Sequence, residues 1–254
     1  MTRTFLLSPA YAGGRRARML LSGRAQFDLA RRLRATEPVS LGEVFTFLSG
    51  LYFRGKLAYA NAFARPDLAR VLVITPTRGL VPAANPVTLA ELREFAAVDI
   101  EEGDPRYRKP LERDLRSLVR QLSPACEVVL LGSVATGKYV SILLEILRER
   151  IRFPAEFVGR GDMSRGGLLL RCAVDRTELA YIPVQGAVRK GKRPPKLQPR
   201  RYAYPPLNTA KANRARSCRL RCARRPAATP IAGPVSRFRQ GNVHLSISAP
   251  SSAR

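Results

Sequence analysis

The chain contains no tryptophan and a single histidine, His244, which lies near its end. A lone histidine this far from the other candidate residues excludes the Ser-His-Asp and Cys-His arrangements of nucleophilic catalysis. Cysteine is also scarce, and Cys218 and Cys222 have no second Cys or His pair at zinc spacing, so no metal site is predicted. Any catalysis is therefore expected to use carboxylates, hydroxyls, lysine or arginine.

Long apolar runs are missing as well. No run approaches the roughly 18 residues of a membrane span. The short apolar patch at the start precedes Arg15, Arg16 and Arg18, which is the reverse of the order in a secretory signal. Together with the few cysteines, these features predict a cytoplasmic protein without disulfides.

Acidic residues stop early, because no Asp or Glu follows Glu178. The 45 lysines and arginines outnumber 19 acids, for a formal net charge of +26, and 17 of those cations follow Gln185. A proline-rich segment with one sign of charge lacks the apolar area that would offset its ordering entropy. We therefore predict a folded domain over residues 1–185 and a disordered basic tail over residues 186–254.

Three apolar runs predict buried strands, at residues 4–8, 71–75 and 127–131. Between and after them, apolar residues at helical spacing predict helices over residues 15–33, 40–48, 55–64, 88–97, 110–122 and 140–151. This alternation is typical of a Rossmann-like α/β fold, with a mainly parallel sheet and helices on both faces. Short apolar segments at 157–158, 168–172 and 179–182 predict a small antiparallel meander at the end of the domain.

Aromatic residues are concentrated between Phe45 and Phe63. Base stacking is one use for such a cluster, but the spacing of Phe45, Leu48 and Tyr52 favours a core-facing helix. Two cations in the same stretch, Arg54 and Lys56, are left as candidates to face a ligand.

The loops after the three strands are the expected ligand site, because the carboxyl ends of parallel strands meet at one edge of the sheet. Each loop combines glycine, a hydroxyl and a cation near a helix start, which favours a phosphate or carboxylate ligand. The candidate binding residues are Ser8, Gly13, Gly14 and Arg15 in the first loop, Thr77, Arg78 and Gly79 in the second, and Gly132, Ser133, Thr136, Gly137 and Lys138 in the third.

The third loop matches G-x-x-x-x-G-K over residues 132–138. A P-loop carries Ser or Thr after the lysine, to bind magnesium, and this chain has Tyr139 there. Three interpretations stay open at this point: a degenerate P-loop NTPase, a phosphate site of another type, and a simple glycine turn that begins a helix.

Two polar segments have both a structural and a functional interpretation. Residues 159–167 hold four glycines and predict either a hairpin loop or a flap with the candidate catalytic residues Arg160, Asp162 and Arg165. An acidic stretch over residues 99–104 predicts a solvated surface, with a metal or general-base cluster as the alternative.

Two short stretches carry a family resemblance. Residues 51–56 (LYFRGK) and 74–80 (ITPTRGL) resemble an uncharacterised bacterial family of Rossmann-like proteins. The opening Leu7-Ser8-Pro9-Ala10 is similar to the start of the YaaA-type peroxide-stress proteins, which are linked to DNA binding, although Tyr11 replaces the lysine that follows in that type. The resemblance implies work on nucleic acids or nucleobases.

The sequence thus predicts a Rossmann-like domain that binds a nucleotide, a nucleobase or a nucleic-acid phosphate, with modification of that ligand as an open question and no cofactor indicated. The alternative is a non-enzymatic nucleic-acid-binding protein that acts through its basic tail. The tail also has the composition of a GC-rich gene read out of frame, in which case its charge carries no information about partners.

Overall fold

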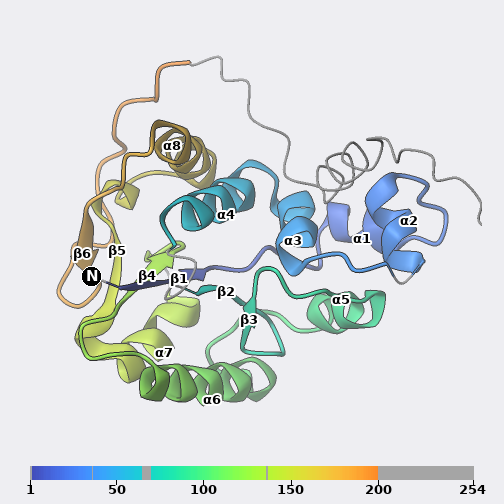
Figure 1. Ribbon diagram of the computed structural model, residues 1–254, viewed down its shortest axis with the longest axis horizontal. Coiled ribbons are helices and arrows are strands. Elements are labelled where there is room, and N and C mark those ends of the chain that lie inside the picture. Colours follow the sequence, from blue (N-terminus) through green and yellow to red (C-terminus); the bar gives the residue numbers. More distant parts are fainter. Residues whose placement is uncertain (1, 36, 65–69, 136, 200–254) are drawn as a thin grey trace, which may run out of the picture. The chain divides into compact units, whose positions relative to one another are not determined.

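Six strands form one mixed sheet in the computed structural model, which describes residues 2–35, 37–64, 70–135 and 137–199 (Figure 1). The strands are β1 (Arg3–Leu7), β2 (Val71–Ile74), β3 (Leu80–Pro82), β4 (Glu127–Leu131), β5 (Ile151–Pro154) and β6 (Tyr181–Pro183). Their order is β3-β2-β1-β4-β5-β6, with the four central strands parallel and β3 and β6 antiparallel at the edges. After β1 the chain adds β2 and β3 on one side of the sheet, and after β4 it adds β5 and β6 on the other side.

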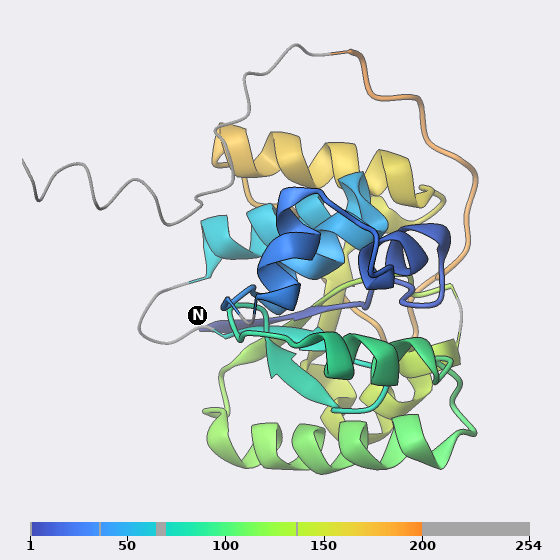
Figure 2. The same cartoon turned by 90° about the vertical axis from the view of Figure 1, so that its right-hand side faces the viewer.

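Helices cover both faces of this sheet. They are α1 (Arg15–Leu21), α2 (Asp28–Arg34), α3 (Leu41–Ser49), α4 (Leu51–Phe63), α5 (Leu89–Ala96), α6 (Pro105–Gln121), α7 (Gly137–Leu147) and α8 (Asp162–Asp175), with short 3₁₀ turns η1 (Arg148–Arg150) and η2 (Ala155–Phe157). Figures 1 and 2 show α4 and α8 on one face and α6 and α7 on the other. The α/β class and the mostly parallel sheet core predicted from the sequence are confirmed.

The apolar runs form the central strands as predicted. Leu6 of β1 pairs in register with Leu72 of β2 and Leu130 of β4, and all three side chains are buried. The aromatic stretch also belongs to the core, because Phe45 and Phe53 are fully buried and stack edge to face with ring centroids 5.4 Å apart.

Four helix predictions need correction. The helix predicted over residues 55–64 begins one turn earlier, at Leu51, and the helix predicted over residues 140–151 ends at Leu147, because residues 148–150 form η1 and Ile151 begins β5. The predicted helix over residues 15–33 is two helices, α1 and α2, because the chain turns through residues 22–27. Gly23 lies in this turn, and the conformational freedom of glycine disfavours a continuous helix there. The helix predicted to start at Pro110 begins one turn earlier, at Pro105, because Asp104 accepts a hydrogen bond from the Arg106 amide and caps it.

The predicted antiparallel meander is wrong for most of its length. Residues 162–175 form the helix α8, so the segment 159–167 is not a hairpin loop and residues 168–172 are not a strand. Residues 155–157 form the turn η2, and β6 alone adds an antiparallel strand, beside β5. The glycines that suggested a loop instead allow α8 to approach α4 closely, since a Cβ on Gly166 would lie 2.8 Å from the Leu51 carbonyl oxygen.

The second predicted ligand loop is also different. β3 follows β2 directly and pairs with it, so residues 75–79 form the turn of a hairpin rather than a strand-to-helix loop. Gly79 has a φ of +60° there and packs on the carbonyl of Pro110, which leaves no room for a side chain.

The last part of the described chain, residues 186–199, forms neither helix nor strand and runs beside α8. Arg171 of α8 donates a hydrogen bond to the Gln198 carbonyl oxygen. The remainder of the predicted basic tail, residues 200–254, lies outside the described residues, and the disorder of that tail stays a prediction. Among the described residues, no helix has the length and apolar character to cross a membrane.

Candidate functional site

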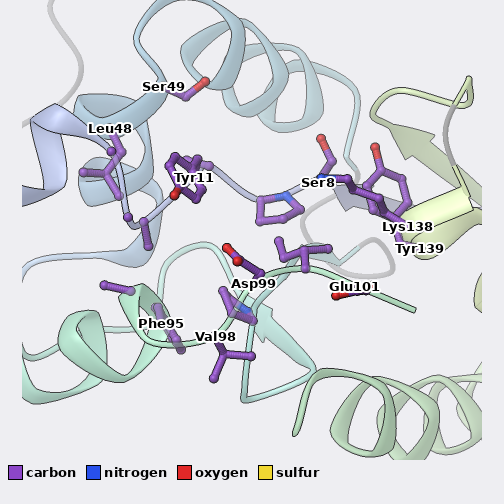
Figure 3. Close-up of a pocket in the computed structure, with 18 of the residues that line it drawn as sticks. Ser8, Tyr11, Leu48, Ser49, Phe95, Val98, Asp99, Glu101, Lys138 and Tyr139 are labelled. Carbon is purple, nitrogen blue, oxygen red and sulfur yellow. The ribbon is translucent and has the colours of Figure 1, made fainter. Parts of the chain in front are cut away.

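A cleft of ≈ 1240 Å³ opens at the carboxyl ends of β1 and β4, where the strand order reverses (Figure 3). The loop that follows β1 forms one wall, and the start of α7 with the residue Ser133 forms one end. The end of α5 and the segment that follows it, within residues 95–102, form the opposite wall. In open α/β sheets this position is the usual place for a ligand, because the loops on the two sides diverge there.

The cleft carries charges of both signs. Arg15, Arg16 and Lys138 line it, and so do four carboxylates, those of Asp99, Glu101, Glu102 and Asp162. The acidic stretch predicted to be a solvated surface thus borders the site. A ligand with both an anionic group and hydrogen-bond donors matches this lining better than a simple anion does.

Ser8, the first residue after β1, lies at the base of the cleft and contacts a buried lysine. Lys56 of α4 is only 1% exposed. Its Nζ donates hydrogen bonds to the Ser8 carbonyl oxygen (2.5 Å) and to Ser8 Oγ (2.9 Å). The same ammonium group lies over the rings of Tyr52 and Phe53, 4.6 and 4.7 Å from their centroids.

No carboxylate lies within ion-pair distance of Lys56 in the part of the chain that the structure describes. Burial therefore lowers the pKa of Lys56 to about 7, and the negative charge of Asp162 opposes that shift. A buried amine that titrates close to neutral pH is suited to accept and return a proton.

Close contact between two helices places this lysine. A Cβ on Gly55 would lie 2.6 Å from the Gly166 carbonyl oxygen, so glycine at both positions lets α4 and α8 touch through their backbones. The contact brings the first turn of α8, with Asp162 and Arg165, next to the helix that carries Lys56.

Two tyrosines border Ser8 and Lys56. Tyr139 of α7 donates its hydroxyl proton to the Ser133 carbonyl oxygen at 2.9 Å, and burial raises its pKa to about 12. A Cβ on Gly132 would lie 2.9 Å from Tyr139 Oη and 3.1 Å from Ser8 Oγ, so glycine there lets the two hydroxyls meet. Burial also raises the pKa of Tyr52, against the opposing effect of the Arg165 guanidinium.

The structure brings most of the first and third predicted loops together. The cleft lining includes Ser8, Gly13, Gly14 and Arg15 from the first loop and Ser133, Gly137 and Lys138 from the third. Gly132 lies behind Ser8 and Tyr139. Thr136 lies outside the described residues.

The second predicted loop contributes only Pro76 to the lining. Arg78 is not available to a ligand, because its guanidinium binds Glu91 at 2.6 Å and Glu94 at 2.8 Å. Thr77 donates to the same Glu94 carboxylate. With Gly79 packed on α6, these three residues stabilise the β2–β3 hairpin and its contact with α5.

The three candidate catalytic residues have different environments. Asp162 is exposed and lines the cleft. Arg165 is buried, donates to the Phe157 carbonyl oxygen at 3.0 Å and forms an ion pair with Asp162 at 3.5 Å. Arg160 donates to Ser164 and borders a separate small groove beside α8.

The P-loop alternative meets a specific obstacle. The position that binds magnesium in P-loop proteins is filled by Tyr139, whose hydroxyl is committed to the Ser133 carbonyl within the same loop. Among the described residues, no group of three or more His, Cys, Asp or Glu is arranged to hold a metal ion.

Compared with family models, curated proteins and solved structures, the chain gives no significant match. The family resemblance of residues 51–56 and 74–80 stays a prediction. The case for function therefore depends on the geometry of the chain itself.

The residue that sequence reasoning undervalued is Lys56. The sequence predicts only that Lys56 or Arg54 could face a ligand, and the structure instead buries Lys56 against Ser8, 48 positions away in the chain. The available signal was its place in α4, a single lysine one turn after Tyr52 and Phe53 and one turn before Tyr59.

Proposed function

We propose that the protein is a Rossmann-like domain that binds a nucleotide or nucleotide-like ligand in the cleft between the β1 and β4 loops. The observation that carries this proposal is the position of the cleft at the reversal of strand order, which is the nucleotide-binding position of such sheets. The strand order 3-2-1-4-5-6 supports the Rossmann-like assignment, although β3 and β6 run antiparallel. The resemblance to Rossmann-like and YaaA-type proteins agrees with it.

The mixed charge of the lining suits the two ends of such a ligand. Lys138 and Arg15 supply charge for a phosphate, and the glycines at 13 and 14 let the ligand approach the backbone. On the opposite wall, Asp99 and Glu101 are exposed acceptors for ribose hydroxyls or an exocyclic amine.

The test is a thermal-shift and calorimetric comparison of AMP, ATP, adenosine, adenine and inorganic phosphate. We expect phosphorylated nucleotides to raise the melting temperature of the parent protein. Lys138→Ala should weaken their binding about tenfold or more, because a charged hydrogen bond contributes roughly 1.5–3 kcal/mol. Asp99→Asn should weaken nucleosides and nucleotides alike and leave phosphate unaffected.

Arg78→Ala is the matched control, because Arg78 is tied to α5 and does not line the cleft. It should leave nucleotide affinity unchanged. The proposal fails if no nucleotide stabilises the parent, or if Lys138→Ala and Arg78→Ala weaken binding equally.

A second candidate function is nucleic-acid binding through a basic surface on α8. The groove of ≈ 310 Å³ beside that helix is lined by Arg160, Arg171, Arg193 and Lys196, and none of the described residues that line it is acidic. Such a surface would bind the phosphate backbone without regard to sequence and with a strong dependence on salt. Replacing Arg193 and Lys196 by glutamate should abolish oligonucleotide binding at low salt, and undiminished affinity would exclude this role.

A further inference from the structure

We propose that Ser8 is a nucleophile that attacks a carbonyl carbon of the bound ligand, with Lys56 as the base that accepts the serine proton. The inference rests on the proposed function in one respect, that the cleft is the ligand site, and it names the substrate class as an ester or another activated acyl compound.

The geometry of the pair is that of a nucleophile and its base. Ser8 Oγ lies 2.9 Å from Lys56 Nζ, within the reach that direct proton transfer requires. Ser8 lines the cleft and is only 6% exposed, whereas Lys56 is 1% exposed and is not among the described residues that line the cleft. Figure 3 shows Ser8 beside Tyr139 at one end of the cleft.

The isolation of Lys56 is the second part of the case. A buried charge without an ionic partner destabilises a folded protein, and proteins usually pair it or replace it by an apolar residue. Arg165, buried in the same region, has both a carbonyl acceptor and the Asp162 carboxylate. Lys56 has hydroxyl, carbonyl and aromatic neighbours but no carboxylate within ion-pair distance among the described residues, so burial brings its pKa close to neutral.

An acyl substrate fits the surroundings of Ser8 better than a phosphoryl substrate. Phosphoryl transfer needs cations or metal ions around the transferred group. The groups next to Ser8 Oγ are the Lys56 amine and the phenol of Tyr139, and the charge of Asp162, which lines the cleft, acts on both.

The reaction has two stages, acylation of Ser8 and hydrolysis of the acyl-serine. Ser8 Oγ forms a bond to the carbonyl carbon while its proton passes to neutral Lys56 Nζ. The bond from that carbon to the leaving oxygen breaks, and the lysine proton passes to the leaving group. Water then attacks the acyl-serine, gives its proton to Lys56 and releases the acid, and the lysine returns that proton to Ser8.

Other charged and titratable groups around Lys56 enter its pH dependence. Tyr52 lies on the same helix, Tyr139 on α7 borders Ser8, and Asp162 and Arg165 come from α8. The tyrosines remain protonated throughout the neutral range, because burial raises the pKa of both. A change of rate near pH 7 is therefore assigned to Lys56.

The experiment treats the full chain with a fluorophosphonate probe, maps the modified residue by peptide mass spectrometry, and follows cleavage of p-nitrophenyl acetate. We expect modification of Ser8, and an ester cleavage rate that rises with pH through about pH 7 and then levels off. Ser8→Ala and Lys56→Met should each lower that rate by about 100-fold or more. Ser117→Ala and Lys109→Met, on the exposed face of α6, are the matched controls and should react like the parent.

Absence of modification in the parent, modification of a residue other than Ser8, or equal rates in Ser8→Ala and the parent would overturn the proposal. If Lys56→Met does not fold, the pH profile of the parent still decides, because a rate without a rise near pH 7 contradicts the role of Lys56. Nucleotide binding by Ser8→Ala, measured by calorimetry, separates failure of this proposal from failure of the binding proposal.

Discussion

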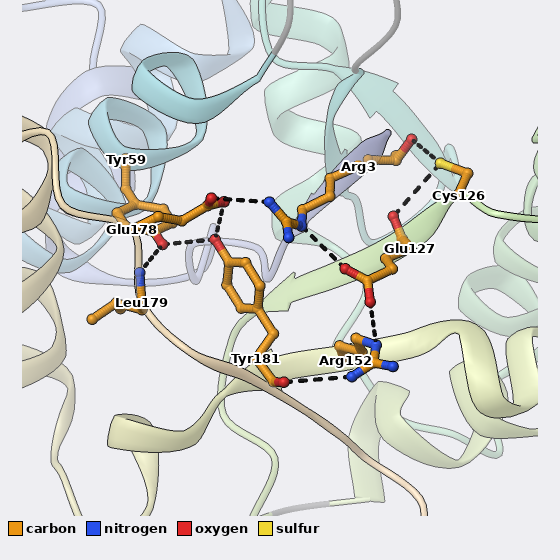
Figure 4. Close-up of polar contacts among 9 residues, drawn as sticks. Arg3, Tyr59, Cys126, Glu127, Arg152, Glu178, Leu179 and Tyr181 are labelled. Atoms are coloured by element: carbon orange, nitrogen blue, oxygen red, sulfur yellow. Dashed lines mark hydrogen bonds and ion pairs between the residues drawn. The ribbon is translucent and has the colours of Figure 1, made fainter. Parts of the chain in front are cut away.

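The two ends of the sheet differ in how their charged side chains are paired. At the amino ends of β1 and β4, Arg3 binds Glu127 at 3.1 Å and Glu178 at 2.9 Å, and Arg152 binds Glu127 at 2.7 Å (Figure 4). At the carboxyl ends, Lys56 meets only Ser8 and two aromatic rings. Arg3 and Arg152 are thus paired with carboxylates, whereas Lys56 has no carboxylate within ion-pair distance among the described residues.

The difference separates a structural cluster from a reactive one. In the amino-end network, Tyr181 donates to Glu178 and shares a hydrogen bond with Tyr59, so the network connects β1, β4, β5 and β6 to α4. The pKa of Arg3 is raised in this network, because burial opposes the shift less than the hydrogen bond to Glu127 and the charge of Glu178 favour it. Lys56, which has no such ionic partner in the described part of the chain, instead titrates near neutral pH. Its burial destabilises the folded protein, and a pKa near 7 suits it to proton transfer.

The largest expected effect comes from separating the two helices that hold the carboxyl-end cluster. A Cβ added at Gly166 would lie 2.8 Å from backbone atoms of Leu51 and Tyr52, so the larger side chain of Gly166→Val would clash with them. Overpacking against backbone should lower the free energy of unfolding by about 3 kcal/mol, measured by urea denaturation, and should also reduce ester cleavage.

Gly167→Ala is the control for this substitution. A Cβ there meets only the Leu197 side chain at 3.6 Å, an ordinary contact, so the change should be neutral or stabilise α8 by up to about 1 kcal/mol. Equal destabilisation by both variants would mean that the α4–α8 contact does not control the site.

A middle-sized effect is expected in the pH dependence of stability. Between pH 7 and 10.5, the unfolded chain holds a proton on Lys56 that the folded protein lacks. The folded protein should therefore lose up to about 1.4 kcal/mol of stability as the pH falls from 9 to 8, and lose no more from this group below pH 7. Lys56→Met should remove this slope in urea denaturation, whereas an unchanged slope would show that Lys56 has an ordinary pKa.

The smallest effect is expected at the amino end. Glu127→Gln removes the carboxylate shared by Arg3 and Arg152, but Arg3 keeps Glu178, and these side chains are 17–32% exposed. We expect a loss of about 1 kcal/mol, smaller at high salt, with ester cleavage unchanged. A large fall in ester cleavage would contradict the separation of the two ends.

The fold was predictable where local pattern and tertiary role agree. The strands β1, β2 and β4 are buried on both faces, and their unbroken apolar runs predict this burial. β5 is four residues long and includes Arg152, so it gave no such signal. The sequence does not predict α8, because Gly161, Gly166 and Gly167 weaken its helical pattern. The contact with α4 that requires Gly166 cannot be inferred from a single sequence.

The sequence predicts the position of the site better than the chemical environment of its residues. Ligands usually bind at the carboxyl ends of parallel strands, and this rule predicted Ser8 and Lys138 as site residues. Both line one cleft because β1 and β4 are neighbours in the sheet. The sequence could not indicate that Arg78 is held by Glu91 and Glu94. Nor could it indicate that Lys56 reaches Ser8, because that contact depends on how α4 packs on β1.

The most direct test of the unmatched lysine is its titration by NMR in protein labelled with ¹³C at lysine Cε. The account predicts one lysine resonance with a midpoint near pH 7, absent from the spectrum of Lys56→Met and shifted in that of Ser8→Ala. Titration of every lysine close to pH 10.4, the ordinary value, would contradict it.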